Sequence, residues 1–118
     1  MLFSKKIRNQ EGFWDIDPVD LKSQLDLGAQ IQLIDVRRPD EYVGELGHIK
    51  GARLITLETE FIDELKKFSS DLPIVFICRS GVRSGKAALF AEARGLVDVY
   101  NLKGGMISWN NHKLPITV

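Results

Sequence analysis

The sequence lacks the features that mark secreted, disulfide-linked or membrane-spanning proteins. Its 118 residues include one cysteine, which excludes an internal disulfide and a multi-cysteine metal site. No apolar run approaches the roughly 18 residues that span a bilayer. The first ten residues, MLFSKKIRNQ, turn polar before a secretory-type apolar region develops. We therefore expect a cytoplasmic protein that does not bind a membrane.

An excess of charge of one sign is also missing. Sixteen basic and sixteen acidic residues give a formal net charge of zero, so the overall balance gives no reason to expect nucleic-acid binding. The one cysteine and two distant histidines form no ligand cluster, so we expect no metal, and nothing indicates a cofactor. Any affinity for an anion must therefore be local.

What is present is typical of one soluble domain. The length suits a single hydrophobic core, and 44% hydrophobic and 27% charged residues are ordinary globular values. Residues 1–12 form an N-terminal extension in this interpretation, and 13–118 form the domain.

Strand and helix patterns alternate along the chain. Apolar or alternating runs predict strands over 13–16, 31–36, 53–55, 74–77 and 97–102. Helical patterns predict one helix that begins after Asp17 and ends at Gly28, and three further helices over 58–68, 84–94 and 106–110. Alternation of this kind indicates an α/β domain with a mainly parallel sheet.

The only cysteine follows a fully apolar strand. Asp35 ends another such strand, and ligands of open α/β sheets bind beyond the carboxyl ends of the strands, so Cys78 and Asp35 are expected at one rim. Gly81 allows successive N–H groups to turn toward the sulfur, while Arg79, Arg83 and the start of the next helix favour a thiolate. Most free cysteines are small buried core residues. A core cysteine does not need a strand end, a glycine loop, two arginines and a helix start around it, so we favour a reactive nucleophile.

Four motifs, which occur along the chain in the same order as in the rhodanese family, resemble the motifs of that family. They are Cys-Arg-Ser-Gly-Val-Arg-Ser at 78–84, Asp-Val-Arg at 35–37 with Glu41-Tyr42, Gly-His-Ile-Lys-Gly-Ala at 47–52, and Leu-Lys-Gly-Gly at 102–105 with Trp109. The similarity runs from about Phe13 to Pro115. It implies a three-layer α/β domain with a central, mainly parallel five-stranded sheet flanked by helices.

The resemblance also implies a chemistry. Cys78 carries one sulfur atom as a persulfide between an anionic, thiosulfate-like donor and a thiophilic acceptor such as cyanide or a thiol. The residues implied to bind the substrate through the loop N–H groups are Arg79, Ser80, Gly81, Val82, Arg83 and Ser84. Arg79 and Arg83 additionally attract the anion.

Other polar residues of these motifs are expected to support the site. For Asp35, Arg37 and Glu41 we favour an ion-paired scaffold over acid–base catalysis. His48 lies in the element that resembles the family's Gly-His-Ile turn, where a hydrogen-bonded packing role is favoured over proton transfer. Gly104 and Gly105 are expected to shape a turn near the rim.

Two alternatives stay open. Phosphatases and arsenate reductases also use a cysteine thiolate in an anion-binding loop, but their pattern has arginine six residues after the cysteine, where this sequence has Ser84; Arg83 is the fifth. The other alternative is a sulfur-relay module whose donor or acceptor is a protein. Comparing turnover of small donors with transfer to candidate proteins distinguishes it from a stand-alone enzyme.

Overall fold

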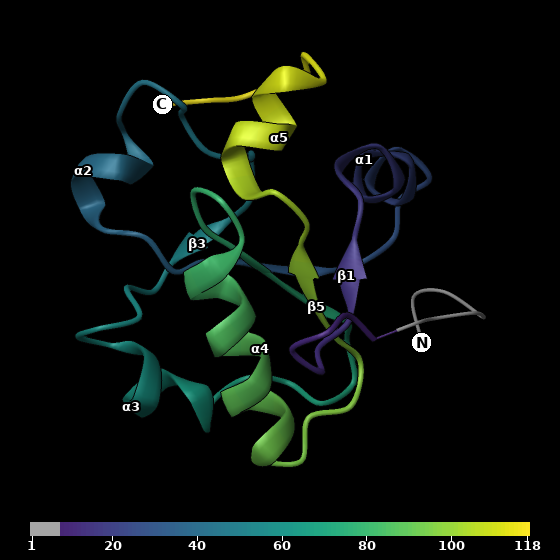
Figure 1. Ribbon diagram of the computed structural model, residues 1–118, viewed down its shortest axis with the longest axis vertical. Coiled ribbons are helices and arrows are strands. Elements are labelled where there is room, and N and C mark those ends of the chain that lie inside the picture. The colour runs from purple at the N-terminus through teal and green to yellow at the C-terminus, as the bar shows by residue number, and fades with distance from the viewer. Residues whose placement is uncertain (1–7) are drawn as a thin grey trace.

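The computed structural model describes residues 8–118, in which a five-stranded sheet lies between helices (Figure 1). The seven residues before Arg8, part of the extension predicted over 1–12, lie outside the described residues. The elements, in chain order, are β1 (Asp15–Ile16), α1 (Pro18–Asp26), β2 (Gln32–Asp35), α2 (Pro39–Tyr42), β3 (Arg53–Leu54), α3 (Phe61–Leu65), β4 (Ile74–Ile77), α4 (Val82–Ala93), β5 (Val99–Leu102) and α5 (Gly105–Asn111).

All the strand pairs of this sheet are parallel, in the order β1-β5-β4-β2-β3. The predicted α/β class and the five-stranded sheet are thus confirmed. β4 is the central strand, and its four residues are all buried, which explains why they are all apolar. None of the helices within residues 8–118 is long and apolar enough to cross a membrane.

Two apolar clusters cover the two faces of the sheet. Because side chains alternate along a strand, β4 gives Ile74 and Phe76 to one cluster and Val75 and Ile77 to the other. The first cluster packs the sheet against α3 and α4, and the second against α1 and α5. The structure therefore has the predicted three layers.

Several predicted boundaries were wrong. The helix predicted over 58–68 covers only α3, because Lys67 and Phe68 donate to carbonyls three residues back instead of four, which ends the α-helical ladder. α4 begins at Val82 and not at Ser84, since Gly81 adopts a positive φ of 100° and acts as its N-cap. The short helix α2 was missed, although Pro39 at its start and two acids in its first turn are helix-start signals.

The start of α5 fixes the backbone just after β4. The amide of Met106 donates to the carbonyl oxygen of Cys78 at 2.8 Å, and the amide of Ile107 donates to that of Arg79 at 3.0 Å. Gly105 makes this approach possible, because a Cβ there would lie 2.4 Å from both carbonyl oxygens. Two carbonyl groups are thereby directed toward α5.

We predict that Gly105→Ala destabilises the fold much more than Gly51→Ala. Both glycines have positive φ, so each alanine costs about 1 to 2 kcal/mol in backbone strain. Only Gly105 adds a steric overlap, about 1 to 3 kcal/mol more, because no atom lies within 4 Å of a Cβ at Gly51. Urea unfolding of the two variants measures the difference. Equal losses would show that the close approach of α5 contributes nothing.

Candidate active site

Cys78 lies at the carboxyl end of the central strand and begins the loop that leads to α4. The parallel register pairs Asp35 with Ile77 and Asn101 with Phe76, so three strand ends meet at one rim. This confirms that Asp35 and Cys78 share an edge of the sheet. Cys78 is 1% exposed, and it is a free thiol.

The sulfur is surrounded by groups of the loop and of the first turn of α4. The Gly81 amide donates to Sγ at 3.0 Å, and the Ser84 hydroxyl oxygen lies 3.1 Å from Sγ. Within residues 8–118, the amides of Val82, Arg83 and Ser84 donate to no acceptor, as expected of a helix start. Among the described residues, one backbone N–H and one hydroxyl lie within hydrogen-bond distance of the sulfur, and no carbonyl does.

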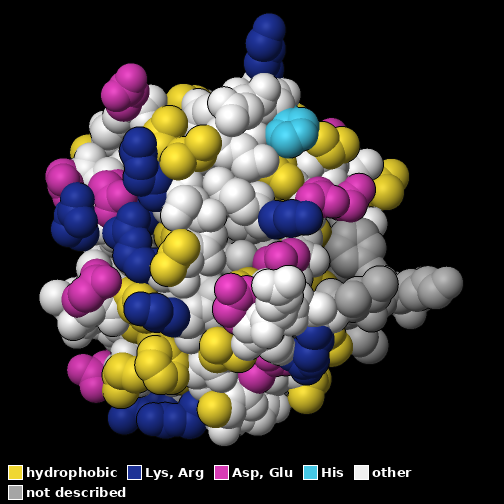
Figure 2. All heavy atoms as spheres, in the orientation of Figure 1, with side chains coloured by type: hydrophobic (Ala, Val, Ile, Leu, Met, Phe, Trp, Pro, Cys, Tyr) yellow, Lys and Arg dark blue, Asp and Glu magenta, His cyan; other side chains and the backbone are white. Residues whose placement is uncertain are grey.

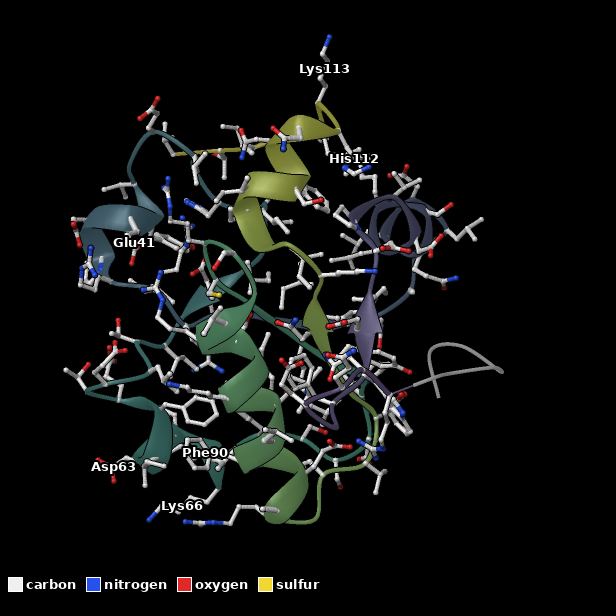
Figure 3. The ribbon with its side chains drawn as sticks, in the orientation of Figure 1. Glu41, Asp63, Lys66, Phe90, His112 and Lys113 are labelled. Carbon is white, nitrogen blue, oxygen red and sulfur yellow. The ribbon has the colours of Figure 1, made fainter. Side chains whose placement is uncertain are left out.

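The two loop arginines differ in their surroundings. Arg83 forms a two-pronged ion pair with Glu41 of α2, with nitrogen–oxygen distances of 2.6 and 2.8 Å. Figure 3 shows Glu41 on α2, across from the first turn of α4. The Arg79 side chain is exposed and has no hydrogen bond or ion pair with the part of the chain described here. Arg79 is therefore the loop cation whose charge is not balanced by direct contact.

The Glu41 ion pair is reflected in both pKa values. Hydrogen bonds from Arg83 lower the pKa of Glu41 from 4.5 to about 2, against the opposing effect of burial. The same contact raises the pKa of Arg83, which also interacts electrostatically with Cys78. Arg83 is therefore a fixed charge beside the cysteine, largely compensated by Glu41.

Asp35 and Arg37 form a buried ion pair behind the rim. Arg37 donates from Nε and Nη2 to the two carboxylate oxygens at 2.9 and 2.7 Å, and both side chains are at most 1% exposed. Arg37 also donates to the carbonyl oxygens of Glu41 and Gly47, which ties the segment around α2 to β2. These contacts suit the scaffold role predicted for Asp35, Arg37 and Glu41.

His48 is held by its neighbours and lies away from the sulfur's contacts. Its Nδ1 lies 2.8 Å from the carbonyl oxygen of Tyr42, and the two rings stack with centroids 3.6 Å apart. Its backbone pairs with Thr117 in both directions. These contacts suit the packing role that we favoured for it.

Two cavities flank the loop. One of about 470 Å³ is lined by Ser80, Gly81 and Val82 together with Lys86 and Lys103. The other, about 170 Å³, lies between α2 and the loop and includes Glu41 and Arg79. Figure 2 shows basic and acidic side chains interspersed over the face on which the loop lies. Among residues 8–118, no three metal-ligating side chains are grouped around a common point.

Sequence reasoning missed two residues that contact the site. Asn101 is 3% exposed on β5, and its side-chain oxygen accepts a hydrogen bond from Ser84. Asp15 of β1 accepts a hydrogen bond from Asn101 at 2.9 Å. A signal was present for Asn101, because an amide within the otherwise apolar run Val-Tyr-Asn-Leu must find partners when buried.

We predict that Glu41→Gln lowers stability in a pH-dependent way. A carboxyl whose pKa is depressed on folding stabilises the fold above its unfolded value, here 4.5, and loses that contribution as pH falls toward about 2. The difference in free energy of unfolding between wild type and Glu41→Gln should therefore be largest near neutral pH and shrink through this window. Urea titrations across the acid range measure it.

The control is Asp40→Asn, which neutralises the neighbouring carboxylate. Asp40 is 73% exposed, and its one ion-pair partner among residues 8–118 is the exposed Arg38, so neutralising Asp40 should change stability little at any pH. If the effect of Glu41→Gln is as small as that of Asp40→Asn, the ion pair with Arg83 does not stabilise the fold.

Comparisons with known proteins agree on one family. A family model described as the rhodanese-like domain matches residues 17–112. The uncharacterized protein YqhL of Bacillus subtilis is 44% identical over 78 residues, which cover 66% of this chain and 60% of that protein. The thiosulfate sulfurtransferase GlpE of Pseudomonas paraeruginosa is 34% identical over 99 residues, or 84% of this chain and 86% of that one.

Solved structures give the same result. A rhodanese-like domain protein from Staphylococcus aureus superimposes with a TM-score of 0.75 at 34% identity, covering 88% of this chain and 98% of that one. The matched segment includes the strand ends, the cysteine loop and α4, so the similarity extends to the candidate site. This chain belongs to the rhodanese-like domain family.

Proposed function

We propose that this chain is a sulfurtransferase in which Cys78 carries a sulfane sulfur. The observation that carries the proposal is the surroundings of the sulfur, which accepts a hydrogen bond from the Gly81 amide just before the start of α4, where the amides of Val82, Arg83 and Ser84 donate to no acceptor within residues 8–118. Family membership and the sulfurtransferase names of relatives such as GlpE support it. The similarity covers 60% of YqhL and 86% of GlpE, so the assignment concerns this domain.

The reaction consists of two displacements at sulfur. In the first, the Cys78 thiolate attacks the outer sulfur of a donor such as thiosulfate; an Sγ–S bond forms, the donor's S–S bond breaks, and sulfite leaves with the electron pair. In the second, cyanide or a thiolate attacks the outer sulfur, and the Sγ–S electron pair returns to Cys78. The second displacement regenerates the Cys78 thiolate, so we expect ping-pong kinetics.

The loop backbone is proposed to hold the transferred sulfur. In the persulfide the negative charge lies on the outer sulfur, and the amides of Val82, Arg83 and Ser84 are the unpaired donors at the start of α4. Arg79 is proposed to attract an anionic donor, because its charge is not paired. Arg83 attracts an anionic donor less strongly than its position suggests, because both terminal nitrogens of its guanidinium are hydrogen-bonded to Glu41.

A phosphatase reaction is disfavoured by the same ion pair. A phosphate-binding arginine must direct its guanidinium at the bound oxygens, but both terminal nitrogens of Arg83 are within hydrogen-bond distance of Glu41. The loop also places arginine one residue closer to the cysteine than the phosphatase pattern does. The protein-partnered relay shares the persulfide chemistry, so only the choice of donor and acceptor separates it from a stand-alone enzyme.

We predict that wild type incubated with thiosulfate gains the mass of one sulfur atom and loses it on addition of cyanide. Cys78→Ser should gain none, because this is the only thiol in the sequence. Intact-protein mass spectrometry measures both, and a cysteine persulfide donor tested in parallel reports the preference between anionic and thiol-derived donors. Sulfur on the serine variant, or strong Cys78-dependent hydrolysis of an aryl phosphate, would overturn the assignment.

A further inference from the structure

A chain of side-chain hydrogen bonds leads from the active-site sulfur to the start of the domain. Ser84 Oγ lies within hydrogen-bond distance of both Cys78 Sγ and Asn101 Oδ1. Asn101 Nδ2 donates to one carboxylate oxygen of Asp15 at 2.9 Å, and Asn9 Nδ2 donates to the other at 3.1 Å. The N-terminal segment is thus connected to the nucleophile through three side chains.

The charge of Asp15 determines which way the Asn101 amide faces. A carboxylate only accepts hydrogen bonds, so the Asn101 NH₂ group must face Asp15 and the amide oxygen must face Ser84. That oxygen is also only an acceptor. Asp15 therefore places an acceptor beside the Ser84 hydroxyl, which is fully buried.

The Ser84 hydroxyl has one hydrogen and two neighbouring acceptors. If it donates to the Cys78 sulfur, the oxygen of Asn101 is left buried without its donor, which is unfavourable. If it donates to Asn101, the sulfur faces hydroxyl lone pairs, an arrangement that suits a protonated thiol and not a thiolate. The Ser84 hydrogen can therefore serve the sulfur or the Asn101 oxygen, but not both at once.

We propose that Asp15 and Asn101 are positioning residues that hold the Ser84 hydroxyl toward Asn101 and so disfavour the empty Cys78 thiolate. The functional meaning of this arrangement rests on the proposed role of Cys78 as the sulfur carrier. In the persulfide the charge moves to the outer sulfur, and Sγ no longer needs the Ser84 hydrogen. The arrangement therefore favours the loaded cysteine over the empty thiolate.

Other charges near the cysteine are unchanged by substitutions at Asp15. Arg83 of α4 interacts electrostatically with Cys78 and is paired with Glu41. The Asp35–Arg37 pair lies at the end of β2, the neighbouring strand. Among residues 8–118, other charged groups near the loop are Arg79, which follows the cysteine, Asp40 and Glu45, which line the cavity that includes Arg79, and Glu58, which interacts electrostatically with Arg83. Lys86, Lys103 and Glu11 line the same cavity as Asp15. Each is present in every variant compared below.

The test compares Asp15→Ala with Asp15→Asn through the pH midpoint of Cys78 alkylation by iodoacetamide, which reacts with the only thiol. Asp15→Ala lets Asn101 rotate and give its NH₂ group to Ser84, which frees the Ser84 hydrogen for the sulfur. One hydrogen bond to a charged group should lower the midpoint by about one pH unit, a tenfold larger thiolate fraction below it. Asp15→Asn keeps an acceptor for Asn101, so its midpoint should stay close to that of wild type.

A double-mutant comparison separates the hydrogen-bond chain from simple charge. In a Ser84→Ala background the effect of Asp15→Ala should disappear, because the hydroxyl that transmits it is gone. Equal shifts in Asp15→Ala and Asp15→Asn, or a shift that persists without Ser84, would overturn the proposal. Should Asp15→Ala fail to fold, Asn101→Leu also removes the acceptor and should lower the midpoint in the same direction; an unchanged or raised midpoint there contradicts the proposal.

Alkylation requires no sulfur donor, so its outcome is independent of the sulfurtransferase assignment. A wild type that takes up no sulfur would refute the proposed function but leave the midpoints interpretable. A wild type that loads sulfur, with variants whose midpoints do not move, would refute the positioning role alone.

Discussion

The chemistry at Cys78 depends on the direction of the peptide groups that follow it. The amides of Met106 and Ile107, in the first turn of α5, donate to the carbonyl oxygens of Cys78 and Arg79, and the missing side chain of Gly105 permits that approach. With these carbonyls turned toward α5, the amide of Gly81 donates to the sulfur and the first amides of α4 remain available. A helix packed on the opposite face of the sheet from α4 thus determines what the nucleophile contacts.

Charge at the rim is balanced more closely than the sequence suggests. Arg83 is matched by Glu41, and Arg37 by Asp35, so of the three arginines in these motifs only Arg79 adds a charge that no described residue compensates by direct contact. Attraction of a donor by charge is therefore modest, and the backbone amides carry more of the proposed binding.

Much of this organisation could be predicted from the sequence, because parallel sheets place strand ends together. The apolar runs before Asp35 and Cys78 indicated buried strands, and their shared rim followed. The partner of Arg83 could not be identified, since Glu41 lies 42 residues away and its helix α2 is only four residues long. The Asp15–Asn101–Ser84 chain joins three elements distant in sequence, and no local pattern reports such contacts.

Amide chemical shifts provide the most direct test of whether the loop amides hold the transferred sulfur. Spectra of ¹⁵N-labelled protein are recorded before and after loading, with uptake of one sulfur verified by mass. We expect the largest changes in chemical shift at the amides of Gly81, Val82, Arg83 and Ser84, and we expect cyanide to reverse them. Loaded protein whose loop amides do not move, while changes appear elsewhere, would contradict this role of the loop amides.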